Sequence, residues 1–247
     1  MRKAAILNSK GGVGKTTTAV NLAAGMASQG CRVLVLDMDP QGHVGVHLNV
    51  QAGPGSMAEM LIDAAEPKDC IQTLRPGIDG ILSDRRLERA ARILTGESYR
   101  ETKLRRLMEG VEGYNFVLAD CAPGMGILSQ NAVMWADEVF IPVSMEFLAL
   151  HGLKELEAQL DEARKMAGHN VKTGCIIPTF YDRRNGRTEE IMAALREKFS
   201  GLVLDPIRIN SKLSEAAAAR EDIFAYDPKS NGAQDYARLT QDILSGR

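Results

Sequence analysis

The residues with the clearest chemistry lie near the amino terminus, where residues 8–17 read Asn-Ser-Lys-Gly-Gly-Val-Gly-Lys-Thr-Thr. The apolar run Ala4–Leu7 precedes them and a helix-length segment follows, so a strand, a glycine loop and a helix are expected in succession. Glycines let backbone N–H groups turn toward phosphate oxygens, and the positive end of the helix points at the same place. In such a loop Lys15 reaches the β- and γ-phosphates and the Thr16 hydroxyl ligates Mg²⁺. The sequence therefore predicts a nucleoside triphosphate site formed by Gly11, Gly12, Val13, Gly14, Lys15, Thr16 and Thr17.

Two acidic stretches follow apolar runs later in the chain. Asp37 and Asp39 end the run that starts at Val33, and Asp120 ends the run that starts at Phe116. Taken alone, each stretch also fits an ordinary turn. In a parallel sheet, however, these strand ends open beside the glycine loop, where Asp120 would hold Mg²⁺ through water.

These side chains need a scaffold, and the chain alternates short apolar runs with helix-length segments. The expected strands are Ala4–Leu7, Val33–Leu36, Phe116–Ala119, Glu138–Val143, Gly174–Ile177 and Leu202–Leu204. The expected helices are Lys15–Gln29, Ser56–Ala64, Asp84–Leu94, Thr102–Glu109, Gly152–Ala167, Thr188–Phe199 and Asn231–Leu244. This alternation predicts an α/β fold with a doubly wound, mostly parallel sheet flanked by helices.

The organisation along the chain is expected to be simple. No linker or low-complexity tract divides it, so residues 1–247 are expected to form a single domain. Leu153, Leu156, Leu160 and Ala163 recur at helical spacing and should face the core. The glycine-rich stretch Gly42–Gly55 reads as a mobile loop.

Composition narrows the class of protein. The formal net charge of −2 gives no whole-chain attraction to nucleic acid or anionic membranes, so such binding would need a local patch. The four cysteines are scattered without a Cys-x-x-Cys pair, which argues against a disulfide framework or zinc site. This usage, with no signal peptide or membrane-length apolar run, favours a cytoplasmic location.

The run Lys-Gly-Gly-Val-Gly-Lys-Thr-Thr, residues 10–17, resembles the deviant Walker A motif of the ParA/MinD family of ATPases, a branch of the P-loop NTPases. The resemblance extends along nearly the whole chain and is strongest to the ParA or Soj partition ATPases. It implies ATP and Mg²⁺ as cofactors and a homodimer in which Lys10 crosses to the partner subunit's nucleotide. Asp39 would help orient the attacking water and the Mg²⁺ shell, and Asp120 matches the Walker B aspartate. Ala122 departs from the family, which usually has proline at that position.

The same resemblance implies that the ATP-bound dimer binds nonspecific DNA of the nucleoid and that a ParB-like or other partner protein stimulates slow hydrolysis. DNA contact is expected through phosphates. The matching positions are Arg184 and Lys212, with Arg183, Arg187 and Arg208 as nearby candidates. Each of these cations also fits an ordinary solvated surface charge. Ile209 replaces a family arginine and residues 217–221 replace a basic segment, so a weaker or shifted DNA surface is expected.

Other functions on this fold stay open. A MinD-like membrane switch would use a basic amphipathic helix at the carboxyl end, where few basic residues occur. A metabolic ATP-dependent ligase or synthetase would need a substrate pocket that the sequence does not identify. An iron–sulfur electron donor is disfavoured because Cys121 has no suitably spaced partner.

Overall fold

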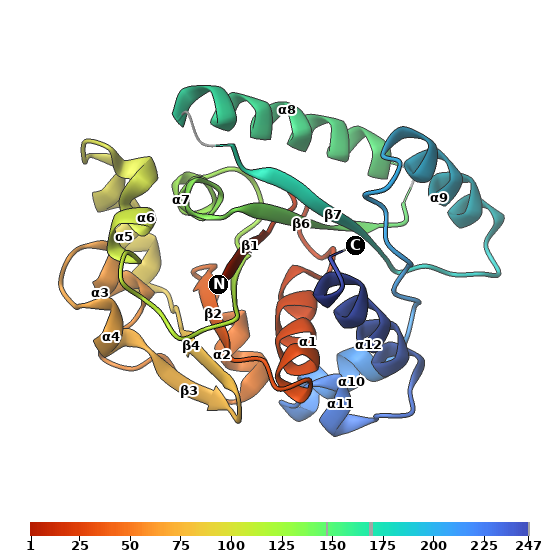
Figure 1. Ribbon diagram of the computed structural model, residues 1–247, viewed down its shortest axis with the longest axis horizontal. Helices are drawn as coiled ribbons and strands as arrows, with labels where there is room; N and C mark the ends of the chain where they lie inside the picture. Colours follow the sequence, from red (N-terminus) through yellow and green to blue (C-terminus); the bar gives the residue numbers. More distant parts are fainter. Residues whose placement is uncertain (147, 168–169, 247) are drawn as a thin grey trace.

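A seven-stranded sheet forms the centre of the protein, in the order β3-β4-β2-β5-β1-β6-β7 (Figure 1). The computed structural model describes residues 1–146, 148–167 and 170–246. All neighbouring strands run parallel except β3 and β4, which form an antiparallel pair. The strands are β1 (Arg2–Ile6), β2 (Val33–Met38), β3 (Gln72–Arg75), β4 (Ile78–Ile81), β5 (Phe116–Cys121), β6 (Glu138–Ser144) and β7 (Lys172–Thr179).

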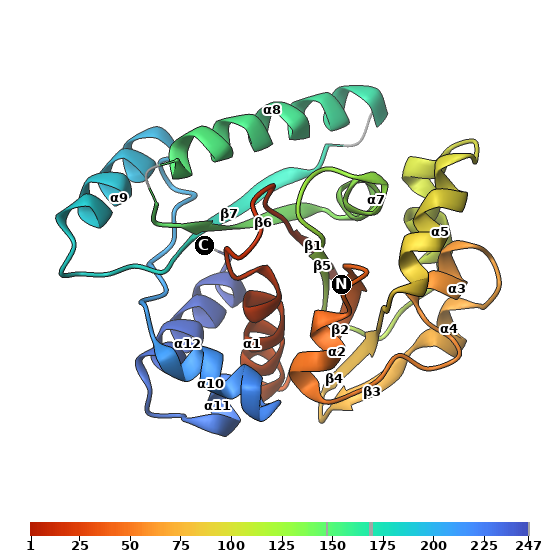
Figure 2. The ribbon, with the colours of Figure 1, turned by 180° about the vertical axis from the view of Figure 1, so that it is seen from behind.

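Helices cover both faces of this sheet (Figures 1 and 2). One face packs against α1 (Lys15–Ser28), α2 (His43–Leu48), α10 (Ser211–Ala219), α11 (Ile223–Tyr226) and α12 (Asn231–Leu244). The other packs against α3 (Met57–Leu61), α4 (Pro67–Cys70), α5 (Arg86–Thr95), α6 (Lys103–Leu107), α7 (Ile127–Trp135), α8 (Ala149–Ala167) and α9 (Gly186–Lys198). A short 3-10 turn, η1 (Arg100–Thr102), leads into α6.

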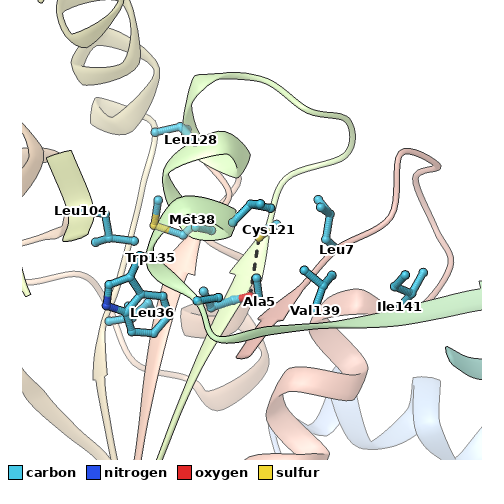
Figure 3. Packing of buried hydrophobic residues seen from close by; sticks show 14 of the residues in the cluster. Ala5, Leu7, Leu36, Met38, Leu104, Cys121, Leu128, Trp135, Val139 and Ile141 are labelled. Atoms are coloured by element: carbon cyan, nitrogen blue, oxygen red, sulfur yellow. Dashed lines mark hydrogen bonds between the residues drawn. The ribbon is translucent and has the colours of Figure 1, made fainter. Parts of the chain in front are cut away.

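The core is divided by the sheet into two layers. Alternate residues of each central strand enter opposite layers: in β1, Ala5 belongs to one layer while Ala4 and Ile6 belong to the other. Because both faces are covered, the strands are apolar on both sides. Figure 3 shows Leu36, Val139 and neighbouring strand residues packed against side chains from α6 and α7.

The predicted fold class is confirmed, since the sheet is mostly parallel and has helices on both faces. The seven expected helices all form, and α12 has the expected bounds. The stripe on α8 is also confirmed, because Leu153, Leu156 and Leu160 are buried.

Two local expectations were wrong. Residues 202–204 are not a strand: they form only an isolated bridge, in which Val203 pairs with Ile176. The stretch Gly42–Gly55, predicted to be a mobile loop, is a loop only in part, because residues 43–48 form α2, whose Val44 and Leu48 are buried against the sheet. The sequence analysis also did not anticipate β3, β4, α4, α7, α10 and α11.

Candidate functional site

The glycine loop lies between the end of β1 and the start of α1, as the sequence predicted. Gly12 has φ +73° and Gly14 has φ +91°, a left-handed conformation that costs other residues a steric penalty. Gly14 precedes the first turn of α1, where no side chain caps the exposed backbone N–H groups. These free donors and the helix dipole form a site suited to an anion.

The two lysines of the loop have different surroundings. Lys15 is buried and its Nζ donates to the Lys10 carbonyl oxygen at 3.0 Å. Burial lowers the pKa of Lys15, although the carboxylates of Asp120 and Asp39 act in the opposite direction. The Lys10 side chain is 54% exposed and forms an ion pair with Glu146 at the rim of the loop. Lys15 therefore belongs to the interior of the site, and Lys10 to its outer edge.

The carboxylate of Asp120 lies beneath the loop. It is fully buried, and neither oxygen has a hydrogen-bond partner. Burial raises the pKa of Asp120 to about 7, while the side chains of Thr16 and Lys15 oppose this rise. Ser9 Oγ is also buried without a partner, so three of the five such atoms in the described part of the chain belong to this site. Buried polar atoms without partners are costly, and a bound ligand or its water would satisfy them here.

The donor set fits a magnesium ion. Mg²⁺ takes oxygen ligands and is usually held by one or two carboxylates together with phosphates and water. Asp120 and Asp39 supply such oxygens at the carboxyl ends of the neighbouring strands β5 and β2, and the Thr16 hydroxyl supplies one from the first turn of α1. Within the described ranges, no three His, Cys, Asp or Glu side chains gather as a protein-only metal cage. The site thus suits a metal that enters with its nucleotide.

The loop after β2 is fixed by Asp37, a residue to which the sequence analysis gave no role. Its buried carboxylate accepts from the backbone N–H groups of Asp39 at 3.1 Å and Val44 at 3.3 Å. Burial and the nearby charge of Asp120 raise the pKa of Asp37 well above its usual range. Ser83 Oγ donates to the Asp39 carbonyl oxygen. These contacts place the Asp39 side chain at the mouth of the site.

The segment after β5 contains Cys121 and Ala122. Cys121 is buried, its Sγ–H donates to the Ala119 carbonyl at 3.7 Å, and burial raises the pKa of its thiol (Figure 3). It is a packing residue in this structure, rather than an exposed metal ligand. The Ala122 carbonyl accepts from Ser129 Oγ at 3.3 Å, so α7 holds this loop.

The cations predicted to contact DNA fall into different environments. The Arg184 side chain is 88% exposed and pairs with Asp182, two residues earlier. Lys212 lies on α10 and pairs with Glu215 at 2.7 Å, while Arg187 is exposed on α9. Arg208 forms a bidentate pair with the fully buried Asp235, so part of its role is structural. The structure does not bring all five predicted cations into one cluster.

A basic groove of about 460 Å³ joins Arg183 and Arg208. Its lining also includes Arg196 from α9 and Arg238 from α12, which the sequence analysis missed. These arginines are far apart in sequence and lie on different helices, so no local pattern could have connected them. Arg196 and Arg238 both pair with Asp205.

Two further residues of the site were missed by the sequence analysis. Thr179, at the end of β7, donates from Oγ1 to the Val13 carbonyl at 2.9 Å and holds the glycine loop. Asn21 of α1 donates from Nδ2 to the Thr17 carbonyl at 2.8 Å. Asn21 follows the motif by only four residues, so helical spacing places it on the same side of α1 as Thr17. This spacing could have identified Asn21 from the sequence.

Comparison with known proteins agrees with this geometry. The AAA domain family matches residues 1–173. The chain is 35% identical to the chromosome partitioning protein ParA of Caulobacter vibrioides, covering 99% of this chain and 94% of that protein. It is 34% identical to the sporulation initiation inhibitor protein Soj of Bacillus subtilis, covering 98% and 97%.

A solved structure extends the comparison to three dimensions. Cobyrinic acid a,c-diamide synthase from Mycobacterium smegmatis, with bound ATP analog and magnesium, superposes with a TM-score of 0.86 at 27% identity. The superposition covers 100% of this chain and 97% of that one. With its glycine loop, its second lysine and relatives similar over nearly their full lengths, the chain belongs to the ParA/MinD family of P-loop ATPases, in its ParA/Soj group.

Proposed function

We propose that the protein is an ATP-dependent switch that dimerises when ATP binds and holds nonspecific DNA in that state. In doing so it segregates or positions a cargo such as a plasmid, a chromosome or a protein assembly. A ParB-like or other partner protein stimulates its slow hydrolysis of ATP. The observation that carries this proposal is the pairing of a buried phosphate site with a second, exposed lysine at its rim.

Binding of Mg²⁺–ATP is assigned to the loop and the buried acids. The backbone of Gly11–Thr17 and the Lys15 ammonium hold the phosphates, while Thr16, Asp39 and Asp120 are the ligands offered to the metal. When bound, Mg²⁺ neutralises phosphate charge during transfer. The similar synthase with its ATP analog and magnesium supports this assignment.

Dimerisation is supported by the surface around the loop. The Lys10–Glu146 pair is more than half exposed, and such pairs contribute little, so Lys10 is readily released to a partner subunit. A cavity of about 450 Å³ beside it is lined by Gly12, Phe180 and Ile209. Phe180 and Ile209 are exposed apolar side chains, and Leu148 is a third. A second copy that faced this surface would cover them.

Hydrolysis is assigned to residues that position groups. Asp39 orients the attacking water, and Lys10 from the partner subunit stabilises charge as it develops on the phosphates. Hydrolysis stays slow until the partner protein completes the arrangement. The γ-phosphate thus selects the dimeric state, and its loss releases that state.

DNA binding is assigned to the basic groove and to the cations near it. Arg183 and Arg208 line the groove, with Arg184, Arg187 and Lys212 on adjoining segments. Arginine and lysine contacts to phosphates give affinity without base readout and make binding sensitive to salt.

The test is binding to nonspecific duplex DNA at moderate salt, with ATP, with ADP and without nucleotide. Wild type should bind only with ATP, and Lys212→Ala and Arg183→Ala should weaken that binding. Lys68→Ala, which removes an exposed cation of α4 outside the groove, is the matched control and should bind like wild type. The proposal would be contradicted if DNA affinity were the same with ATP, with ADP and without nucleotide, or if no nucleotide state bound DNA.

An ATP-dependent synthase is the second candidate, because a synthase is among the similar structures at 27% identity. The same assay separates the two, since a synthase would consume ATP with its small-molecule substrates and show no ATP-dependent DNA binding. A MinD-like membrane switch is less favoured. Helix α12 buries Tyr236, Leu239 and Ile243 in the core, and no described helix is long and apolar enough to cross a membrane.

A further inference from the structure

Helix α10, which carries Lys212, ends at a short segment that touches both elements flanking the nucleotide site. This segment, residues 220–223, is called the junction below. It connects α10 to α11 and lies beside α1 and α2, below the sheet in Figure 1. It also overlaps the stretch where the sequence departs from the family pattern.

The first tie joins the junction to α1. Asn21 is buried, and its Oδ1 accepts from the Ile223 backbone N–H at 2.7 Å. Its Nδ2 donates to the Thr17 carbonyl at 2.8 Å. One amide side chain therefore connects the last residue of the phosphate motif with the start of α11.

The second tie joins the junction to α2. Arg220 Nη1 donates to Asn49 Oδ1, and Asn49 ends α2. The buried imidazole of His47, also on α2, lies against the Glu221 backbone. Helix α2 directly follows the loop that carries Asp39, and the Asp37 carboxylate bonds to both that loop and the start of α2. A shift of the Asp39 loop would therefore be transmitted to α2.

The junction has little freedom to absorb such a shift. Arg220 holds a left-handed conformation with φ +63°, and its backbone N–H donates to the Ala217 carbonyl at 3.1 Å. The Glu221 N–H donates to Ala216 at 3.0 Å, and Arg75 Nη2 donates to the Arg220 carbonyl at 3.1 Å. The end of α10 is thus fixed to the elements that it touches.

We propose that Asn21, Asn49 and Arg220 are positioning residues through which α1 and α2 set the orientation of α10, so that the presentation of Lys212 follows the nucleotide state. The inference rests on the proposed function, since it concerns how DNA affinity responds to ATP. The coupling is the ratio of the DNA affinities measured with ATP and with ADP. By linkage, DNA must change the ratio of ATP affinity to ADP affinity by the same factor.

The experiment uses glycine substitutions at the two left-handed positions, because glycine keeps this backbone conformation without strain. Asn49→Gly, Arg220→Gly and the double variant each remove the same hydrogen bond. DNA binding is titrated with ADP and with a non-hydrolysable ATP analogue, and nucleotide affinity is titrated with and without DNA. Arg75→Ala is the control, because it removes a contact to the junction from β3, which does not border the nucleotide site.

Each single variant should reduce the coupling ratio about 2- to 30-fold, and the double variant should reduce it no further. Nucleotide affinity without DNA should stay that of wild type. Asn49→Gly changes no charge, so its effect separates coupling from direct contact between Arg220 and DNA. A stability role alone would lower the unfolding midpoint and leave the ratio intact.

The outcomes are distinguishable. If wild-type DNA affinity does not depend on nucleotide, the proposed function fails and this inference fails with it. If wild type shows the dependence but both single variants keep the full ratio, the inference alone is overturned. An equal loss in Arg75→Ala would also overturn it, because any disturbance of the junction would then suffice.

Discussion

The phosphate site and the basic groove are built in opposite ways. At the phosphate site, Asp120 is buried without a partner and the first turn of α1 has no side-chain cap. In the groove, Arg208, Arg196 and Arg238 already pair with acids of the same chain. The first site therefore has bonding capacity that a bound ligand would satisfy, whereas most cations of the second already have partners in the same chain.

This difference separates a specific site from an adjustable surface. Unsatisfied groups in fixed positions favour one ligand strongly, while paired surface cations exchange one partner for another at small cost. Each substitution at the phosphate site should therefore have a large effect on its own. Substitutions in the groove should have graded effects that depend on salt.

The largest effect is expected from Asp39→Ala. The backbone of the loop stays in place through Asp37 and Ser83, so ATP should still bind. The rate of hydrolysis should fall about 100-fold or more, because the attacking water loses its orienting group. Single-turnover hydrolysis and nucleotide titration measure the two quantities, and the ATP-bound dimer should accumulate in size-exclusion chromatography. A variant that hydrolyses ATP normally would remove Asp39 from the mechanism.

Lys15→Ala should weaken nucleotide binding by roughly 100-fold, since charge-assisted hydrogen bonds to phosphate are lost from a buried position. Lys10→Ala is the matched control, because its ammonium lies at the exposed rim with Glu146. It should bind nucleotide like wild type and fail to dimerise. Equal losses in the two variants would mean that the distinction between interior and rim lysines is wrong.

In the groove, Arg208→Ala should lower the free energy of unfolding by about 2 kcal/mol, because the buried Asp235 loses its bidentate partner and keeps only Arg238 and the backbone N–H of residue 208. Arg184→Ala breaks only an exposed pair and should leave urea unfolding unchanged. The two variants thus separate structural from available cations. A comparable loss of stability in Arg184→Ala would show that its exposed pair matters more than its surroundings indicate.

The smallest effect concerns the nucleotide-free protein. The pKa of Asp120 is raised to about 7, so the folded state holds a proton between pH 4 and pH 7 that the unfolded state has lost. This contribution makes the protein more stable as the pH falls through 7 and less stable above it. Asp120→Asn should raise the unfolding midpoint at pH 8 by roughly 3 °C and remove the part of the pH dependence that Asp120 contributes. An unchanged midpoint at pH 8 would mean that the buried charge is not costly.

The sequence was most informative where function constrains local chemistry. The glycine loop, Lys15 and Asp120 could be predicted because each residue type is needed at a fixed spacing from a strand or helix. The major strands and helices were predicted for a related reason, since the side of a helix or strand that packs into the core carries apolar residues at a regular spacing. The resemblance to a family added the proposed role of Lys10 in a partner subunit, which no spacing within one chain could supply.

What the sequence did not reveal depends on contacts between distant segments. Asp37 looked like part of a turn, but folding makes it the anchor of the Asp39 loop. Arg196 and Arg238 line the same groove only because folding brings α9 and α12 to its border. Helix α2 was read as a mobile loop because its glycines suggested flexibility, although Gly42 and Gly45 serve close packing: a Cβ on either would lie 2.7 Å or less from a backbone carbonyl oxygen.

The segment that lies alongside β7 affects how copies of this protein can associate. Residues 202–209 bond along the outer side of β7, from Ile176 to Tyr181, and so occupy backbone groups that an open edge strand would expose. At the opposite edge, β3 is only four residues long and carries Gln72, Thr73 and Arg75. Neither border of the sheet therefore offers a long apolar template for edge-to-edge growth into fibres. Copies of this protein at high local concentration would therefore meet without a long open strand edge to pair through.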